Sequence, residues 1–220
     1  TQPPFFCGID TVTDYDGNSY HTVEIGQQCW MKENLRTKHY ADGTEIPFGT
    51  SPSETAPYRS APGDNNLNVP IYGYLYNWAA VMNGTTSSNA NPSGVQGICP
   101  PGWHVPSKAE WEQLDSYVSS QSHYVCGGSP DNISKALAGT SGWSNQDENP
   151  CSVHFYQLNN NATGFSALPA GESSGNGAGN FGITADFWSS THHTGFGNLA
   201  AYIFTIGGAY TQNHTVLQLC

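Results

Sequence analysis

Six cysteines carry the most reactive side chains of this chain: Cys7, Cys29, Cys99, Cys126, Cys151 and Cys220. As thiolates, cysteines act as nucleophiles or metal ligands, whereas as oxidised pairs they crosslink the backbone. None of the six forms a Cys-x-x-Cys pair or has zinc-ligand spacing, and their even number favours disulfides. Among the many pairings that six cysteines allow, we predict Cys7–Cys29, Cys99–Cys220 and Cys126–Cys151, formed in an oxidising compartment.

Carboxylates and imidazoles offer a second kind of chemistry. A hydrolase would need an acid/base pair, and the candidates are Asp147, Glu148, Glu172 and Asp186. Asp186 is also followed by His192-His193, which would add two metal ligands, although a histidine pair in a polar loop is more often solvated. The chain contains no Gly-x-Ser-x-Gly elbow, no His-Glu-x-x-His helix and no phosphate-binding glycine loop with its lysine. We therefore predict a protein that is not an enzyme, with a hydrolase as the minor alternative.

A calcium site is the one cofactor that the sequence leaves open. Asp14, Asp16 and Asn18 alternate as oxygen ligands do in a calcium loop, but further acidic ligands and the distal glutamate are missing. The Asp16-Gly17 pair is also typical of a tight hairpin turn. We therefore expect turn chemistry here, with a structural calcium ion as the alternative and no other cofactor.

Aromatic residues are the best candidates for a binding surface. Most tryptophans fall inside recurring motifs and are expected to pack in the core. Trp143 lies in a polar stretch and, together with Tyr156, is predicted to form an exposed platform for sugar rings or a protein partner, to which the loop around Trp188 would contribute.

Modification signals are present but weakly specific. Four Asn-x-Ser/Thr sequons begin at Asn83, Asn132, Asn161 and Asn213. Asp10-Thr11-Val12 is similar to a short bacterial O-glycosylation acceptor, which makes Thr11 a further candidate. In a chain rich in asparagine, serine and threonine, chance matches are also expected.

Composition narrows the class of protein. The 220 residues carry a net charge of −11, and charged residues make up 10%, against about 25% in an average soluble protein. The six basic residues are scattered, which argues against nucleic acid as a partner. No apolar run approaches the ~20 residues of a membrane-spanning helix. Without an initiator methionine or signal peptide, Thr1 is expected to be a processed or trimmed end.

The elements that position these residues follow from local patterns. Residues 11–30 predict a β-meander, and Ser107 with Glu110 predicts a capping box that starts an amphipathic helix. Residues 71–82 predict a buried helix ended by Asn83-Gly84, and residues 133–138 a short helix. Strands are predicted over residues 164–169, 185–190, 200–206 and 210–219, and a polar insertion over 119–162. This order predicts one α+β domain over residues 1–220, with antiparallel sheets and an N-terminal arm over residues 1–10.

Six motifs in order resemble the Fibrobacter succinogenes major paralogous domain, a family of bacterial surface modules. They span nearly the whole chain: Val12–Tyr20, Ile25–Leu35, Tyr74–Trp78, Cys99–Trp111, Gly164–Gly171 and Phe187–Thr191. The resemblance implies a C-type-lectin-like fold with two or three short helices and long loops, secretion to the bacterial cell surface, and no known catalytic residues. The Glu-Pro-Asn motif of calcium-dependent sugar sites is absent.

The expected function is that of a non-enzymatic, secreted or cell-surface module with a structural or adhesive role. Its expected partners are further copies of itself or other surface proteins, and glycans in the alternative of a lectin-like module. In a filament, residues 1–6 would add as a strand to a neighbouring subunit, although their prolines weaken such a strand.

Overall fold

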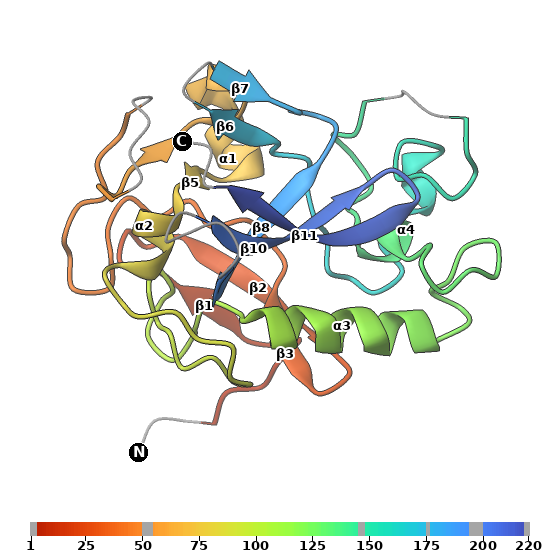
Figure 1. The fold of residues 1–220 in the computed structure, drawn as a ribbon, viewed down its shortest axis with the longest axis horizontal. Helices are drawn as coiled ribbons and strands as arrows, with labels where there is room; N and C mark the ends of the chain where they lie inside the picture. Colours follow the sequence, from red (N-terminus) through yellow and green to blue (C-terminus); the bar gives the residue numbers. More distant parts are fainter. Residues whose placement is uncertain (1–3, 50–54, 145–147, 175–176, 194–199, 218–220) are drawn as a thin grey trace.

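A computed structural model describes residues 4–49, 55–144, 148–174, 177–193 and 200–217 of the chain. It is an α+β structure in which two three-stranded antiparallel sheets, two strand pairs and short helices are joined by long loops (Figure 1). The α+β prediction with antiparallel sheets is confirmed. The division into a single domain over residues 1–220 stays a prediction.

The first sheet is the predicted meander. Its strands are β1 (Thr11–Thr13), β2 (Ser19–Ile25) and β3 (Gln28–Met31), in that order. In β2, Tyr20, Thr22 and Ile25 are buried, and Tyr20 is fully enclosed. The Tyr20 hydroxyl donates to Asp14 Oδ2 at 2.6 Å and accepts from the Arg36 backbone N–H at 3.0 Å. The sheet is thereby fixed to the loop that follows it.

The second sheet comes from the end of the chain. It consists of β8 (Ala185–His192), β10 (Ala200–Gly207) and β11 (Tyr210–Leu217), in the order β11-β10-β8. The hairpin predicted around Gly207-Gly208 is confirmed, because Gly207 pairs with Tyr210. The strand predicted over residues 164–169 is wrong. That segment makes a single bridge, Ala138 with Ala167, and Ser166 adopts a positive φ of 67° that a strand does not accommodate.

Two short strand pairs complete the strands. β4 (Arg59–Ser60) pairs with β5 (Leu75–Tyr76), and β6 (Glu172–Ser174) pairs with β7 (Gly177–Gly179). Both pairs are antiparallel. Three single 3-10 turns lie over Pro62–Asp64, Asn66–Asn68 and Gln157–Asn159.

The longest helix, α3 (Lys108–Ser120), begins as the sequence predicts. The Ser107 side chain accepts from the Glu110 backbone N–H, and the Glu110 carboxylate accepts from the Ser107 N–H at 2.9 Å. This capping box satisfies two donors that a helix start leaves unpaired. Leu114 and Val118 are completely buried on the inner face, together with Trp111.

The helix predicted over residues 71–82 is interrupted. The structure has α1 (Val69–Tyr72), then β5, then α2 (Trp78–Met82), which ends at the left-handed Asn83 as expected. Gly73 breaks the helix with a φ of 74°, and a Cβ there would lie 2.4 Å from the Leu35 carbonyl oxygen. Asn77 then restarts it by accepting from the Ala80 N–H at 3.0 Å.

The predicted insertion, residues 119–162, is rich in loops, but it is not a polar segment that lies outside the core. Its first residues end α3, and the helix α4 (Ser134–Leu137) lies close to the predicted 133–138. Ile133, Leu137, Trp143 and Val153 are nevertheless buried in the main hydrophobic cluster with residues of α3 and β10. The insertion therefore contributes a substantial part of the core.

Candidate functional site

The described residues enclose a cleft of about 1110 Å³. Residues far apart in the sequence line it, mainly from segments 27–35, 74–77, 101–106, 170–173 and 186–188. All of β3 and three residues of β8 belong to the lining, and both are edge strands of their sheets. Pockets of this size bind drug-sized ligands or a stretch of a polymer.

Aromatic rings from α3, β3, β8 and the loop at Phe165 line the inner wall of the cleft, and Phe204 of β10 packs against them from outside the lining. Trp111 of α3 stacks on Trp30 of β3, with ring centroids 4.6 Å apart. Its other neighbour is Phe204 of β10, whose ring is nearly parallel at 4.7 Å. Phe165 and Phe187 meet the same indole at 6.2 Å and 5.6 Å. Because these rings fix one another, the inner wall is rigid.

The opening of the cleft is also aromatic. Trp103 is half-buried in the Pro-Pro-Gly turn before α3, and Phe5 meets it edge-on at 5.9 Å. Phe5 itself is 50% exposed. Trp188 of β8 is half-buried, and its Nε1–H donates to the Tyr76 carbonyl at 2.8 Å. The prediction that Trp188 belongs to a binding surface stays a prediction, and the residue lines the cleft.

One ion pair between a partly exposed imidazole and a buried carboxylate joins the cleft to α3. His104 Nε2 lies 2.7 Å from Glu110 Oε1, and Glu110 Oε2 accepts from the Ser93 and Ser107 backbone N–H groups. The hydrogen bond with Glu110 raises the pKa of His104. Burial alone would raise the pKa of Glu110, but the hydrogen bonds from His104, Ser107 and Ser93 lower it. The pair is thus most stable with both groups charged.

Two of the predicted disulfides are present. Cys7 is bonded to Cys29, which lies in the cleft lining, and Cys126 is bonded to Cys151. Cys99 is buried, and burial raises the pKa of its thiol to about 12. It forms no disulfide within the described part of the chain. Its predicted partner Cys220 lies outside the described residues, so the Cys99–Cys220 bond stays a prediction.

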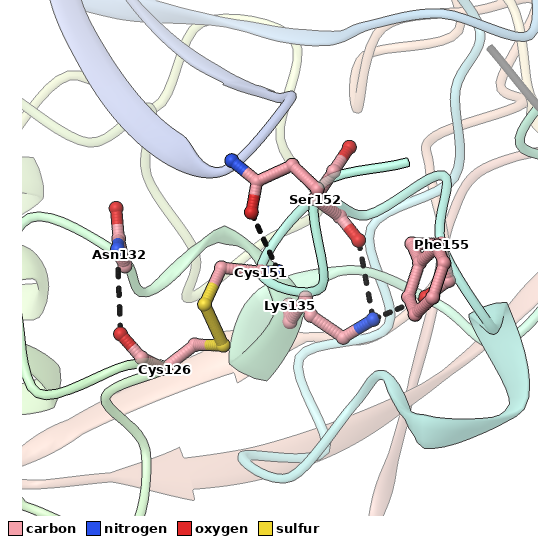
Figure 2. The surroundings of a disulfide bond; sticks show 7 residues. Cys126, Asn132, Lys135, Cys151, Ser152 and Phe155 are labelled. Atoms are coloured by element: carbon pink, nitrogen blue, oxygen red, sulfur yellow. Dashed lines mark hydrogen bonds between the residues drawn. A yellow bond between two sulfur atoms is a disulfide. The ribbon is translucent and has the colours of Figure 1, made fainter. Parts of the chain in front are cut away.

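Lys135 organises the loop beside the second disulfide (Figure 2). Its ammonium group donates to the backbone carbonyls of Ser152 and Phe155. Burial lowers the pKa of this lysine. On the Cys126 side of the disulfide, the Cys126 N–H donates to the Asn132 carbonyl at 2.9 Å, and the Asn132 side-chain amide donates to the Cys126 carbonyl at 3.3 Å. These contacts fold the loop inward.

The predicted platform of Trp143 and Tyr156 is wrong for Trp143. Only 3% of Trp143 is exposed, its Nε1–H donates to the Gly139 carbonyl at 3.0 Å, and its ring meets His154 edge-on. The backbone groups of Trp143 are bonded to the Gln157 amide, which ties the loop down over the indole. Tyr156 is 71% exposed and lies outside the cleft lining.

The carboxylates proposed for catalysis or metal binding are divided between the cleft and the surface, and a bridge between Gly171 and Ala185 makes Glu172 and Asp186 neighbours. Glu172 and Asp186 line the cleft, Glu148 is exposed, and Asp147 lies outside the described residues. Asp186 accepts from the hydroxyls of Thr184 and Thr205 at 2.6 Å and 2.5 Å. The ring of His192 packs against Trp78. No cluster of three metal-binding side chains occurs among the residues that the structure describes.

The candidate calcium loop uses its oxygens for the fold. Asp14 accepts from the Asn18 backbone and amide N–H groups and from Tyr20. Asp16 accepts from the Lys38 and His39 backbone and from the Thr37 hydroxyl. Turn chemistry accounts for Asp14, as expected, whereas Asp16 holds the separate loop at residues 37–39.

The predicted glycosylation acceptors differ in their surroundings. Asn83 and Thr11 are exposed. The amide nitrogen of Asn132 donates to the Cys126 carbonyl, and that of Asn161 donates to the Ser166 hydroxyl at 2.8 Å. Asn213 in β11 pairs with Phe204 in β10, and the structure does not describe the Asn213 side chain. Modification of any of them stays a prediction.

Sequence reasoning missed Ser60, Trp103 and the His104–Glu110 pair as cleft residues. Trp103 and His104 stand in the Cys99–Trp111 motif, next to the helix start. That motif indicates a helix start and hence a structural role. Nothing in its spacing indicates that residues of β4, β5 and β8 line a cleft together with it.

Comparison with known proteins identifies the family. No helix in the described part of the chain is long and apolar enough to cross a membrane. No curated protein and no solved structure matched the chain. The family model for the Fibrobacter succinogenes major domain matches residues 23–216. This range begins inside β2 and ends one residue before the end of β11, and it includes all of the cleft lining except Phe5. The chain therefore belongs to the Fibrobacter succinogenes major domain family.

Proposed function

We propose that this chain is a non-enzymatic, extracellular module of the bacterial surface that binds a partner in its cleft and serves adhesion. The observation that carries the proposal is the cleft of about 1110 Å³ with a rigid aromatic wall and an aromatic opening. Clustered aromatic rings dominate the energy of many interfaces. The two disulfides support the extracellular location, since such bonds persist in oxidising compartments.

The proposal includes a C-type-lectin-like fold. Small antiparallel sheets, few short helices and long disulfide-closed loops support it, together with the resemblance of the motifs. Such a scaffold presents loops for binding.

A role without catalysis is supported by the surroundings of the reactive side chains: the two cleft carboxylates are hydrogen-bonded within the fold, and the Cys99 thiol is buried. Asp186 is bonded to two threonine hydroxyls, and Glu172 accepts from the Asn180 amide at 2.9 Å. The Cys99 thiol is buried with a raised pKa, so it is a poor nucleophile.

Adhesion of protein-coated beads tests the proposal. Beads carrying the wild-type chain are expected to be retained on bacterial cell-surface polymers, and beads carrying Trp103→Ala are expected to be released. Tyr15→Ala is the matched control, because Tyr15 is 59% exposed and lies outside the cleft lining. Equal retention of all three proteins would exclude binding in the cleft. Release of soluble products that depends on Glu172 or Asp186 would overturn the non-enzymatic role.

Self-association is a second candidate, supported by apolar side chains near the start of the chain. Phe5, Phe6 and Ile9 are 50%, 56% and 80% exposed. A turn holds the last two together, because the Ile9 N–H donates to the Phe6 carbonyl at 3.2 Å. Contiguous exposed apolar residues of this kind mark interaction sites. A second copy that covers them would explain their exposure.

Electron microscopy of native material distinguishes this assembly from a dispersed module. Filaments or ordered oligomers are expected, and they are expected to be lost in the double variant Phe6→Ser/Ile9→Ser. Leu158→Ser is the control, because Leu158 is 86% exposed at a different place in the chain. Native material that contains only dispersed monomers would contradict assembly.

A further inference from the structure

Two polar groups in the cleft lining have no hydrogen-bond partner within the described part of the chain. They are the Nε1–H of Trp30 and the hydroxyl of Ser60, and both atoms are shielded from solvent. Ser60 as a whole is only 1% exposed. A buried polar group without a partner costs about 1–3 kcal/mol, so a molecule in the cleft that hydrogen-bonds to these two groups would recover that free energy.

Trp30 differs from four of the other five tryptophans of this chain. Four other indoles donate to backbone carbonyls: Trp78 to Ser189, Trp111 to Trp188, Trp143 to Gly139 and Trp188 to Tyr76. The fold thus supplies an acceptor to each of these four indoles, whereas the Trp30 N–H in β3 has none among the described residues. An indole N–H only donates, whereas a serine hydroxyl both donates and accepts. A ligand rich in hydroxyl groups matches both requirements.

The remaining lining favours a ring-shaped ligand with apolar faces. Trp103 stands half-buried at the opening, and Trp30 and Trp111 form the wall behind it. Flat aromatic rings offer a large, rigid contact area at low entropic cost. A pyranose ring has both an apolar face for such contacts and hydroxyl groups at its edge.

The charge of the cleft restricts which sugars fit. The ionisable side chains of the lining are mostly acidic: Lys32, Glu33, His104, Glu110, Glu172 and Asp186. The whole chain has a net charge of −11. Like charges disfavour a polyanionic ligand, so uronate-rich or sulfated chains are excluded by repulsion.

We infer that the cleft is a binding site for neutral carbohydrate chains. Trp103 stacks on a sugar ring at the opening, and the Trp30 N–H and Ser60 hydroxyl bind sugar hydroxyl groups inside. The inference rests on the proposed function as a binding module, and it adds the chemical class of the ligand. It requires no calcium ion.

Calorimetric titration with defined oligosaccharides tests this site. Hexasaccharides of glucose, xylose and mannose are the neutral probes, and oligogalacturonate is the acidic one, each with calcium and with chelator. We expect at least one neutral probe to bind independently of calcium and the acidic probe not to bind. Four tryptophans line the cleft, so binding is also expected to change the intrinsic fluorescence.

Matched serine variants separate the site from the fold. Ser60→Ala is expected to weaken binding by about tenfold, because one buried hydrogen bond is lost. Ser134→Ala is the control, since Ser134 is equally buried and unpaired but lies outside the cleft lining. Trp103→Ala is expected to abolish binding, with near-ultraviolet circular dichroism verifying that it folds.

Three results would overturn the inference: no binding of any neutral probe, equal binding of the acidic probe, or affinity unchanged by Ser60→Ala. Its failure is distinguishable from failure of the proposed function. If beads still adhere in a Trp103-dependent way to a protein surface while no oligosaccharide binds, the module binds a different ligand. If neither occurs, both proposals fall.

Discussion

Two segments of nearly equal length are closed by disulfides, yet they are held in different ways. Cys7 and Cys29 are 22 residues apart, and Cys126 and Cys151 are 25 apart. The first segment contains β1, β2 and the start of β3, whose ladder pairs almost every residue between 19 and 31. Among its described residues, the second contains one element, the single-turn helix α4.

The first segment is also anchored from outside. The Gln28 amide donates to the Glu110 carbonyl at 2.9 Å, and the Tyr117 ring of α3 lies against Gly26. The second segment depends on its disulfide, on Lys135 and on the burial of Ile133, Leu137 and Trp143. Regular hydrogen bonding makes a crosslink redundant locally, whereas a loop-built core needs it.

The largest effect is expected from the double variant Cys126→Ser/Cys151→Ser. Freeing a loop of this size lowers the free energy of unfolding by about 3 kcal/mol. In addition, residues 127–150 are expected to open locally, because little regular backbone pairing holds them. Chemical denaturation measures the first effect, and hydrogen exchange with limited proteolysis measures the second. Unchanged protection in residues 127–150 would break the comparison.

Cys7→Ser/Cys29→Ser tests the other half of the comparison. Loop closure predicts a similar loss of about 3 kcal/mol in global unfolding. Locally, however, only the residues before β1 are expected to lose protection, since the ladder of β1, β2 and β3 remains. Hydrogen exchange resolved to residues 4–31 decides this. If β2 and β3 exchange as fast as the released arm, the strands are not the stronger restraint.

Lys135→Met is expected to have an intermediate effect. Methionine keeps much of the side-chain volume but leaves the Ser152 and Phe155 carbonyls without their donor, which costs about 2 kcal/mol. Thermal unfolding followed by circular dichroism measures the loss. Lys108→Met provides the control, because the Lys108–Glu112 pair lies on the surface and contributes about 0.5 kcal/mol or less. Equal losses of stability in both variants would show that the Lys135 hydrogen bonds do not stabilise this loop.

The smallest effect on stability is expected from the His104–Glu110 pair, whose Glu110 also accepts, at its backbone carbonyl, the hydrogen bond from Gln28 that anchors the first segment. Below its unfolded pKa, near 6.5, His104 stabilises the fold, and this is lost as the pH rises through its raised folded pKa. Glu110 stabilises above its unfolded pKa, near 4.5, and this is lost as the pH falls through its lowered folded pKa. The pair therefore stabilises most between these two pH values.

His104→Gln is expected to remove this pH dependence. Relative to the variant, the wild type should be more stable at about pH 5.5 than at about pH 8.5. Because the imidazole is partly exposed, solvent screening limits the difference to about 0.5 kcal/mol. Denaturant titrations at both pH values measure it. Parallel stability curves for the two proteins would show that the pair does not anchor α3.

Features that depend on neighbours in sequence were predictable. The capping box of Ser107 and Glu110 requires residues three apart, and the hairpin of β10 and β11 is encoded by alternation and Gly207-Gly208. The Cys7–Cys29 and Cys126–Cys151 disulfides were predictable because each closes one local segment of the chain. The meander at residues 11–31 followed for the same reason.

Features that depend on distant contacts were not. Trp143 is buried because Gly139, His154 and Gln157 surround it, and a polar neighbourhood in sequence gives no sign of that. Gly73 interrupts a helical pattern because the Leu35 carbonyl, far earlier in the chain, lies against it. The cleft needs both sheet edges and the turn at Trp103 together, so its lining has no local pattern to reveal it.

The contact of Phe5 with Trp103 has a practical consequence for measurements on this protein. The chain enters its fold beside the cleft opening, and the Cys7–Cys29 bond holds that entry point in place. A fluorescent dye attached near Phe5 would therefore report on cleft occupancy directly, through quenching by Trp103. The same position is a poor choice for an affinity tag, because a tag there would compete with the ligand for the opening.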